Sequence, residues 1–336
     1  MENTMTPGVT PAIPASEEDR IYRKVGWRLV PLLVVCYVVA YLDRVNVGFA
    51  KLQMLQELQF SETVYGLGAG IFFIGYFIFE IPSNIILHKV GARVWIARIM
   101  ITWGIISACM MFVTSVHMFY ALRFLLGAAE AGFFPGIILY LTYWYPAARR
   151  GRITTFFMTA VPMSGLIGGP ISGWIMSTFH GDHGLSGWQW LFLLEGIPSV
   201  VIGVLVLIYL DDRINKAKWL TASEKAVLIR NIAAEEQQKE DPPIRAALTR
   251  PRVWAMALIY FSFVMGLYGV GFWMPSLIKS TGVQSPLAIG LLTAIPNLFA
   301  VIGMILISRN SDRLRERRWH VALPVSYTHL TLPTKA

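Results

Sequence analysis

Long uncharged apolar stretches constrain the fold of this chain more than any other feature of its sequence. A helix needs about 20 mostly apolar residues to cross a bilayer, and stretches of that length recur along most of the 336 residues. Charged residues make up 15% of the chain, against about 25% of a soluble domain. We therefore predict an all-α polytopic membrane protein with spans at 29–49, 64–87, 94–113, 118–144, 153–179, 188–210, 253–278 and 286–307.

The distribution of basic residues indicates how these spans are oriented. The formal net charge of +9 could point to a nucleic-acid partner, but the charges are confined to particular loops. If the spans alternate, all 29 Lys and Arg residues fall on one side except Arg44, Lys51, Arg123, Lys279 and Lys335. Because loops rich in Lys and Arg stay in the cytoplasm, we expect a multi-pass protein of the inner or plasma membrane, with a cytoplasmic N-terminus and no nucleic-acid partner.

Charged residues interrupt two of the predicted spans, with Asp43 and Arg44 in the first and Arg123 and Glu130 in the fourth. A charge in the hydrocarbon region costs roughly 2.5–3.5 kcal/mol on insertion scales, so it is retained mainly where it lines a polar cavity or meets a partner. Asp43 lies about 100° around the helix from Arg44. Arg123 and Glu130 share a helix face about 10 Å apart along the axis, so each needs a partner on another helix. We interpret these four residues as a cluster that binds an anion and carries a proton.

Within this cluster, Arg44 is the residue that we expect to hold an anionic substrate. Its planar guanidinium matches a carboxylate with two parallel hydrogen bonds. The alternative is that Arg44 only neutralises Asp43 or Glu130. Glu130 is the candidate for loading and unloading a proton, and the alternative for this residue is a fixed ion pair. Glu195 is a third intramembrane acid, to which the sequence gives no role.

One long polar stretch, 211–252, separates the first six predicted spans from the last two. Within it, Thr221 precedes Glu224 by three residues, which is the spacing of a capping box at the start of a short helix. We expect a disordered cytoplasmic tail at 1–19, a six-helix bundle at 20–210 and a cytoplasmic linker at 211–252. The start of a second bundle follows at 253–324, with a tail foreign to the protein at 325–336.

Six stretches occur in the order, and at the helices, in which a known family carries them: YLDRVNVGFA, GYFIFEIPSNIIL, GARVWIARIMITWGIISA, RFLLGAAEAGFFPGIILYLTYWYP, GWQWLFLLEGIPS and SDRLRERRWHVALP. They resemble the major facilitator superfamily, and most closely its anion:cation symporter branch of tartrate, phthalate and hydroxyphenylacetate permeases. The resemblance covers roughly residues 22–324. It implies a fold of two six-helix halves, of which this chain holds the first half and the first two helices of the second.

The resemblance also implies roles for individual residues in the membrane. It assigns proton coupling to Asp43 and Glu130, with Arg123 beside them, and substrate contacts to Tyr41 and Tyr76. Tyr268, in the seventh span, either contacts the substrate or faces lipid, and we include it among the substrate-binding residues.

Cytoplasmic loops gate the transporters of this family, and the resemblance assigns that role here to Arg93, Asp312 and Arg313. The first of these loops usually carries an acid before its basic run, but His88 stands in its place, which puts the first loop's gating role in doubt. The family also has four more helices after His320. We therefore expect a truncated chain that does not transport by itself, with a genuine eight-helix protein as the alternative.

The fifth span carries Gly165, Gly169 and Gly173 at intervals of four, a spacing that lets another helix approach closely. Pro162 and Pro170 allow this helix to bend. Sugar-acid transporters of the branch place a polar amide in this span, whereas residues 160–162 are apolar here. This difference favours a small or aromatic carboxylate over a highly hydroxylated sugar acid.

The function that we expect is proton-coupled symport of an organic anion by alternating access. Sodium-coupled transport or exchange of organic anions is one alternative, and a membrane sensor derived from a transporter is another. The sequence has no phosphate-binding glycine loop, no metal-ligand spacing and no nucleophile–base pair, so we expect neither an enzyme nor a cofactor. When full length, the protein is expected to act as a monomer.

Overall fold

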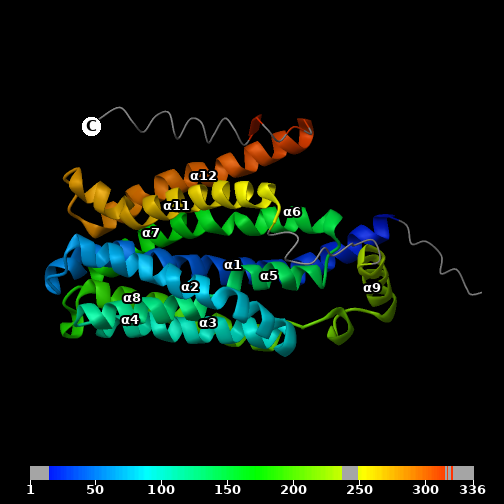
Figure 1. Cartoon of the computed structure of the whole chain (residues 1–336), viewed down its shortest axis with the longest axis horizontal. Coiled ribbons are helices and arrows are strands. Elements are labelled where there is room, and N and C mark those ends of the chain that lie inside the picture. Colours follow the sequence, from blue (N-terminus) through cyan, green and yellow to red (C-terminus); the bar gives the residue numbers. More distant parts are fainter. Residues whose placement is uncertain (1–14, 237–248, 315, 317–318, 321–336) are drawn as a thin grey trace, which may run out of the picture.

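The computed structural model describes residues 15–236, 249–314, 316 and 319–320, and every regular element in this part of the chain is a helix. Figure 1 shows most of the helices lying side by side along the long axis of the molecule. In chain order they are α1 (Ala15–Glu57), α2 (Glu62–Val90), α3 (Ala92–Cys109), η1 (Met110–Phe112), α4 (Val116–Glu130), α5 (Phe133–Thr142), α6 (Ala147–Met158), α7 (Ala160–Thr178), η2 (Asp182–Gly184), α8 (Gly187–Tyr209), η3 (Ile214–Lys216), α9 (Ala222–Glu236), α11 (Pro251–Ser280) and α12 (Pro286–Leu314).

Within the described residues, seven helical segments are long and apolar enough to cross a membrane, and they match seven of the predicted spans. The predicted span at 153–179 is instead divided between α6 and α7, which meet at Thr159. α7 reaches 19 residues, but its glycine, serine and proline residues make it less apolar than the other spans. The chain therefore has the predicted all-α architecture of a six-helix half followed by two further helices.

α1 is a central helix of 43 residues, which packs against α7, α8 and α11. It begins at Ala15, so residues 15–19, which were predicted to belong to a disordered tail, are helical. Glu17 and Glu18 favour this start because the N-terminal end of a helix dipole is positive. Asp19 also pairs with Arg149 of α6 at 2.6 Å. We call the end of the molecule where α1 begins the α9 end, since α9 lies there (Figure 1), and the opposite end the Lys51 end.

The predicted span at 118–144 is interrupted halfway. α4 ends at Glu130 and α5 begins at Phe133, with Gly132 between them at φ +82°. Residues with a side chain rarely adopt this backbone conformation, and a Cβ at Gly132 would collide with the side chain of Ser83. The break in the span therefore falls directly after Glu130, one of the predicted intramembrane acids.

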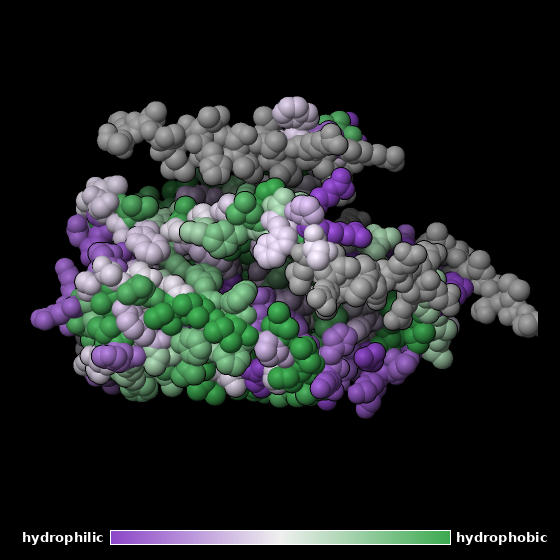
Figure 2. Space-filling model, viewed as in Figure 1, coloured by the Kyte–Doolittle hydropathy of each residue, from purple (hydrophilic) through white to green (hydrophobic). Residues whose placement is uncertain are grey.

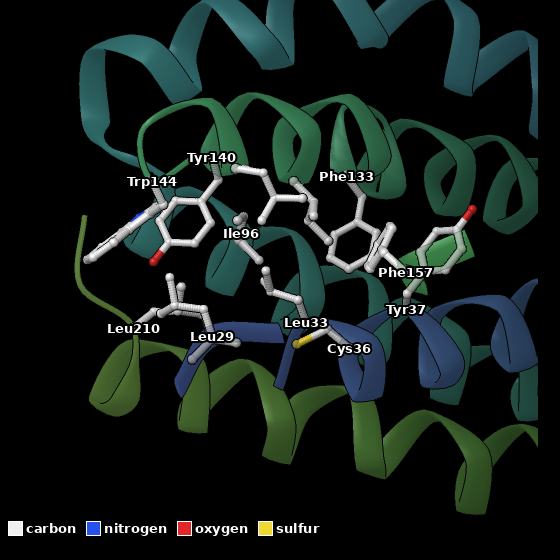
Figure 3. Close-up of a cluster of buried hydrophobic side chains, with 14 of the residues drawn as sticks. Leu29, Leu33, Cys36, Tyr37, Ile96, Phe133, Tyr140, Trp144, Phe157 and Leu210 are labelled. Carbon is white, nitrogen blue, oxygen red and sulfur yellow. The ribbon is translucent and has the colours of Figure 1, made fainter. Parts of the chain in front are cut away.

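The core of the α9 half of the molecule is aromatic and aliphatic (Figure 3). Leu33 and Cys36 of α1 face Ile96 of α3 and Phe133 of α5. The rings of Tyr37 and Phe157 lie 4.6 Å apart between centroids. Cys36 is fully buried among these apolar side chains.

The two helices after the linker pack against the first six at specific places. α12 lies along α7, where a Cβ at Gly169 would be 2.7 Å from the carbonyl oxygen of Gly290. α11 crosses α1 at Gly48, where an added Cβ would be 2.9 Å from the carbonyl oxygen of Phe272. The predicted close approach at the glycines of the fifth span is therefore confirmed, and its partner is α12.

Apolar side chains also cover much of the outer surface, as a lipid-facing surface requires. Figure 2 shows them over the visible face of the helices, with polar side chains gathered towards the two ends. Between Val253 and Leu267, α11 exposes most of its large apolar side chains, among them Tyr260.

Candidate substrate and proton site

An ion pair between Arg44 of α1 and Glu130 of α4 lies at the centre of the predicted cluster. Both side chains are buried, and a guanidinium N–H of Arg44 also donates to the hydroxyl of Tyr268 on α11. The structure thus brings together three of the predicted site residues from three helices. In this conformation Arg44 neutralises Glu130, which is one of the two alternatives that the sequence left open.

Aromatic rings surround the guanidinium of Arg44. Its central carbon lies 5.9 Å from the ring centroid of Tyr41, 5.4 Å from that of Tyr76 and 5.6 Å from that of Tyr268. The three predicted tyrosines therefore converge on Arg44, at distances where a cation is attracted to the face of a ring. Phe72 completes the group at 5.7 Å. The sequence analysis missed Phe72, although its position four residues before Tyr76 places both on one face of α2.

Arg123 lies beside this group on α4 and is fully buried. Its Nε donates to the carbonyl oxygen of Gly68 at 3.2 Å. Its Nη1 and Nη2 have no hydrogen-bond partner within the described part of the chain. Its central carbon lies 4.8 Å from the centroid of Phe72 and 6.0 Å from that of Phe272. Two guanidinium groups therefore share the Phe72 ring, and one of them has two unused donor groups.

Asp43 points away from Arg44, as the 100° offset along the helix predicts. Its Oδ1 accepts a hydrogen bond from Ser107 of α3 at 2.9 Å, and its Oδ2 accepts one from Ser199 of α8 at 2.5 Å. The four charged residues predicted as one cluster thus lie on two sides of α1. The sequence pattern fixes the face of Asp43, but it contains no signal for the two serines that meet it.

The predicted gating residues lie in two separate helices, with Arg93 in the first turn of α3 and Asp312 and Arg313 in the last turn of α12. The backbone N–H of Arg93 donates to Asp212 Oδ1 at 3.0 Å, so an acid that follows α8 caps the start of α3. Arg313 is exposed at the end of α12, and the side chain of Asp312 lies outside the described part of the chain. The ring of His88, at the position where the family carries an acid, lies 3.2 Å from the hydroxyl of Tyr143.

Two surface cavities lie away from this cluster. One, of about 720 Å³, is lined by Arg309, Arg313 and His320 near the end of α12. The other, of about 150 Å³, lies between Trp27 and Tyr209. Neither is lined by Arg44, Glu130 or Arg123. The candidate site is therefore defined by its buried, convergent polar groups, and cavity size does not identify it.

Comparison with known proteins identifies the family. The model of the Major Facilitator Superfamily matches residues 33–327. NicT of Pseudomonas putida, named for metabolite transport, is 58% identical over 90% of this chain and 70% of its own length. A protein of Agrobacterium vitis named for tartrate transport is 55% identical over the same shares. The quinolone resistance transporter of Acinetobacter baumannii is 42% identical over 91% of this chain and 71% of its own length.

Solved structures show the same fold. A bacterial homologue of the human lysosomal transporter Spinster, in an inward-facing conformation, aligns with a TM-score of 0.66 and 17% identity. The chain covers 64% of that structure, and 90% of the chain is aligned. The xylose transporter XylE of Escherichia coli aligns with a TM-score of 0.63 and 16% identity, over 85% of this chain and 71% of its own. Together with the family match and the close relatives, this fold shows that the chain belongs to the Major Facilitator Superfamily, whose members are multi-pass membrane transporters of small molecules and not enzymes.

Proposed function

We propose that this protein is a proton-coupled symporter that carries a small carboxylate across the inner or plasma membrane, with its N-terminus in the cytoplasm. One observation carries the proposal: Arg123 is fully buried, and its Nη1 and Nη2 have no partner within the described part of the chain. A buried charge without a partner is strongly unfavourable. A carboxylate supplies two acceptors in the geometry of a guanidinium, and the relative named for tartrate transport supports this class of substrate.

The position of Arg123 relative to Arg44 favours a short anion between them. Both guanidinium groups lie within 6 Å of the Phe72 ring centroid. Arg44 donates to the hydroxyl of Tyr268 on α11. Arg123 lies over the ring of Phe272, which is one helical turn further along α11. A small dicarboxylate offers one acceptor group to each arginine, and the surrounding rings exclude water from both.

The Arg44–Glu130 pair supports the proposal that a proton is coupled to the anion. Arg44 cannot present its guanidinium to a substrate carboxylate while it is paired with Glu130. A proton that binds to Glu130 removes the negative charge of this carboxylate and releases Arg44 towards the anion. Proton and anion therefore bind together, and they leave together when Arg44 returns to ionised Glu130. Alternating access around a site between the two halves moves both across the membrane.

Calorimetry on the purified chain tests the binding site, with tartrate as the first of a series of small carboxylates. We expect Arg123→Gln to weaken tartrate binding by about 10-fold or more, because a hydrogen bond to a charged group contributes about 1.5–3 kcal/mol. Arg98→Gln is the matched control, since this arginine of α3 stacks on Trp95 at 3.8 Å, outside the cluster. Equal tartrate affinities in Arg123→Gln and the unmodified chain would contradict the proposal.

A further inference from the structure

A second group of buried polar residues lies on the side of α1 that faces away from Arg44. It contains two carboxyl groups, Asp43 with 0% exposure and Glu195 with 3%. Glu195 Oε1 accepts a hydrogen bond from Ser172 of α7 at 2.6 Å, while Asp43 is held by Ser107 and Ser199. The group therefore joins α1, α3, α7 and α8 in the interior of the first six helices.

The helix geometry places Glu195 opposite Asn46. α1 and α8 pack together and run in opposite directions, and Asp43 of α1 meets Ser199 of α8. One turn towards the Lys51 end, the next residue on the same face is Asn46 on α1 and Glu195 on α8. Asn46 Nδ2 donates to Asp43 Oδ1 in a long hydrogen bond of 3.5 Å. The side-chain amide of Asn46 thus lies between the two carboxyl groups.

The two carboxyl groups have no basic partner within the described part of the chain. On α1, Arg44 is paired with Glu130 on the opposite face, and on α3, Arg98 is stacked on Trp95. α7 contains no charged residue, and Glu195 is the one charged residue of α8. Two neighbouring buried carboxylates cannot both be ionised without a large electrostatic cost. At least one of them therefore holds a proton.

The hydrogen bonds decide which of the two carboxyl groups holds the proton. Asp43 accepts hydrogen bonds from Ser107, Ser199 and Asn46, which together stabilise a negative charge. Glu195 accepts one from Ser172. Among the residues that the structure describes, Glu195 Oε2 and Asn46 Oδ1 are both buried with no hydrogen-bond partner. A proton on Glu195 Oε2 converts this unpaired acceptor into a donor beside the unpaired acceptor of Asn46.

We infer that Glu195 is a second proton-binding site of this transporter, which holds a proton while Asp43 keeps the negative charge. The site lies across α1 from the Arg44–Glu130 pair. Because Asp43 and Arg44 are consecutive residues of one rigid helix, a movement of α1 that breaks one group of contacts also displaces the other. Only this link to transport rests on the proposed function, since the protonation of Glu195 follows from its surroundings alone.

Infrared spectroscopy of the purified chain tests the inference, because the carbonyl stretch of a protonated carboxyl group is separate from the amide bands. At pH 7 we expect a carboxylic-acid band that is absent in Glu195→Gln and retained in Glu130→Gln, whose carboxylate is ion-paired. Ser172→Ala should shift this band to higher frequency, because the acid loses a hydrogen bond. Glutamine keeps the shape of a neutral acid, so Glu195→Gln should unfold at the same temperature as the unmodified chain.

Identical bands in Glu195→Gln and the unmodified chain would overturn the inference. Proton counting during uptake by a chain extended with the C-terminal part of a relative such as NicT separates this failure from a failure of the proposed function. If Glu195→Gln loses the band but the extended chain shows no proton-driven uptake, the proton-binding site stands and the proposed coupling fails. If uptake is proton-driven and Glu195→Gln changes neither the band nor the number of protons per anion, the inference fails and the proposed function stands.

Discussion

At the scale of single residues, Glu130 is the group whose proton should control Arg44. Glu130→Gln replaces the carboxylate by a neutral amide of similar shape, which resembles the protonated acid and cannot return to the charged form. The test uses the chain extended by the C-terminal part of a relative such as NicT, because this chain covers 70% of that protein's length and is not expected to transport by itself. In the extended protein, we expect the variant to exchange labelled tartrate for unlabelled tartrate across a proteoliposome membrane, because Arg44 is free to bind the anion. Accumulation driven by an inward proton gradient should be lost, because no proton is then bound and released.

The same assay separates the alternatives for the coupling ion. Uptake by the extended protein without the substitution should stop when a protonophore collapses the proton gradient, and it should not respond to a sodium gradient. A Glu130→Gln variant that still accumulates tartrate in response to a pH difference would place the proton carrier elsewhere. Binding of tartrate without any uptake by the extended protein would favour a sensor.

The sequence predicted the side chains of this site better than their partners. The positions of Tyr41 and Arg44 on one face of α1, and the offset of Asp43 from them, follow from the helical repeat alone. The serines that bind Asp43 come from α3 and α8, and no pattern in α1 encodes which helices pack against it. Arg123 was grouped with the proton-coupling residues, but its unpaired guanidinium can be recognised only when its neighbours are in place.

At the scale of helices, the contact between α7 and α12 depends on residues without side chains. A Cβ at Gly290 would overlap the carbonyl group of Gly169, and rigid backbone cannot yield as a flexible side chain can. We expect Gly290→Ala to lower the melting temperature in detergent by several degrees, since overpacking costs typically 1–3 kcal/mol. Gly303→Ala in the same helix is the matched control, because nothing lies within 4 Å of its added Cβ.

Gly303→Ala should leave the melting temperature unchanged or raise it slightly, since alanine favours a helix over glycine by about 1 kcal/mol. Equal melting temperatures for both variants would mean that α12 is not held against α7 in solution. The interval of four between Gly165, Gly169 and Gly173 predicted a close helix contact. The spacing defines a face of the helix but not its partner, so α12 could be identified only from the structure.

At the scale of the whole molecule, different contacts hold its two ends. At the Lys51 end, the Nζ of Lys279 on α11 donates to the carbonyl oxygen of Leu52 at 3.0 Å, and the Tyr65 hydroxyl donates to that of Phe272 at 3.2 Å. At the α9 end, α9 docks on the first helices. Its Asn231 donates to the Tyr22 hydroxyl at 3.2 Å. The linker helix is therefore part of the folded first half.

The docking of α9 should depend on pH through Glu224. Thr221 and Glu224 form the predicted capping box: the backbone N–H of Thr221 donates to Glu224 Oε2 at 2.8 Å, and the backbone N–H of Glu224 donates to Thr221 Oγ1 at 3.3 Å. The Nζ of Lys24 on α1 also pairs with Glu224 Oε2 at 2.8 Å. Burial raises the pKa of Glu224, but the hydrogen bonds from Lys24 and Thr221 outweigh it and hold the pKa below its ordinary value. The stabilisation is therefore fully present above the ordinary pKa of glutamic acid, about 4.3, and is lost as the pH falls through the lower folded value.

Hydrogen exchange of residues 222–236, corrected for the intrinsic effect of pH, measures this docking. We expect slow exchange at pH 7 and exchange several-fold faster below about pH 4. Glu224→Gln should exchange faster already at pH 7 and change little on acidification, because its side chain carries no titratable charge. Glu62→Gln, which changes a carboxylate at the Lys51 end, should leave the exchange of α9 as it is. If Glu224→Gln keeps the pH dependence of the unmodified chain, other carboxylates at the α9 end, such as Glu18 and Glu235, control the docking.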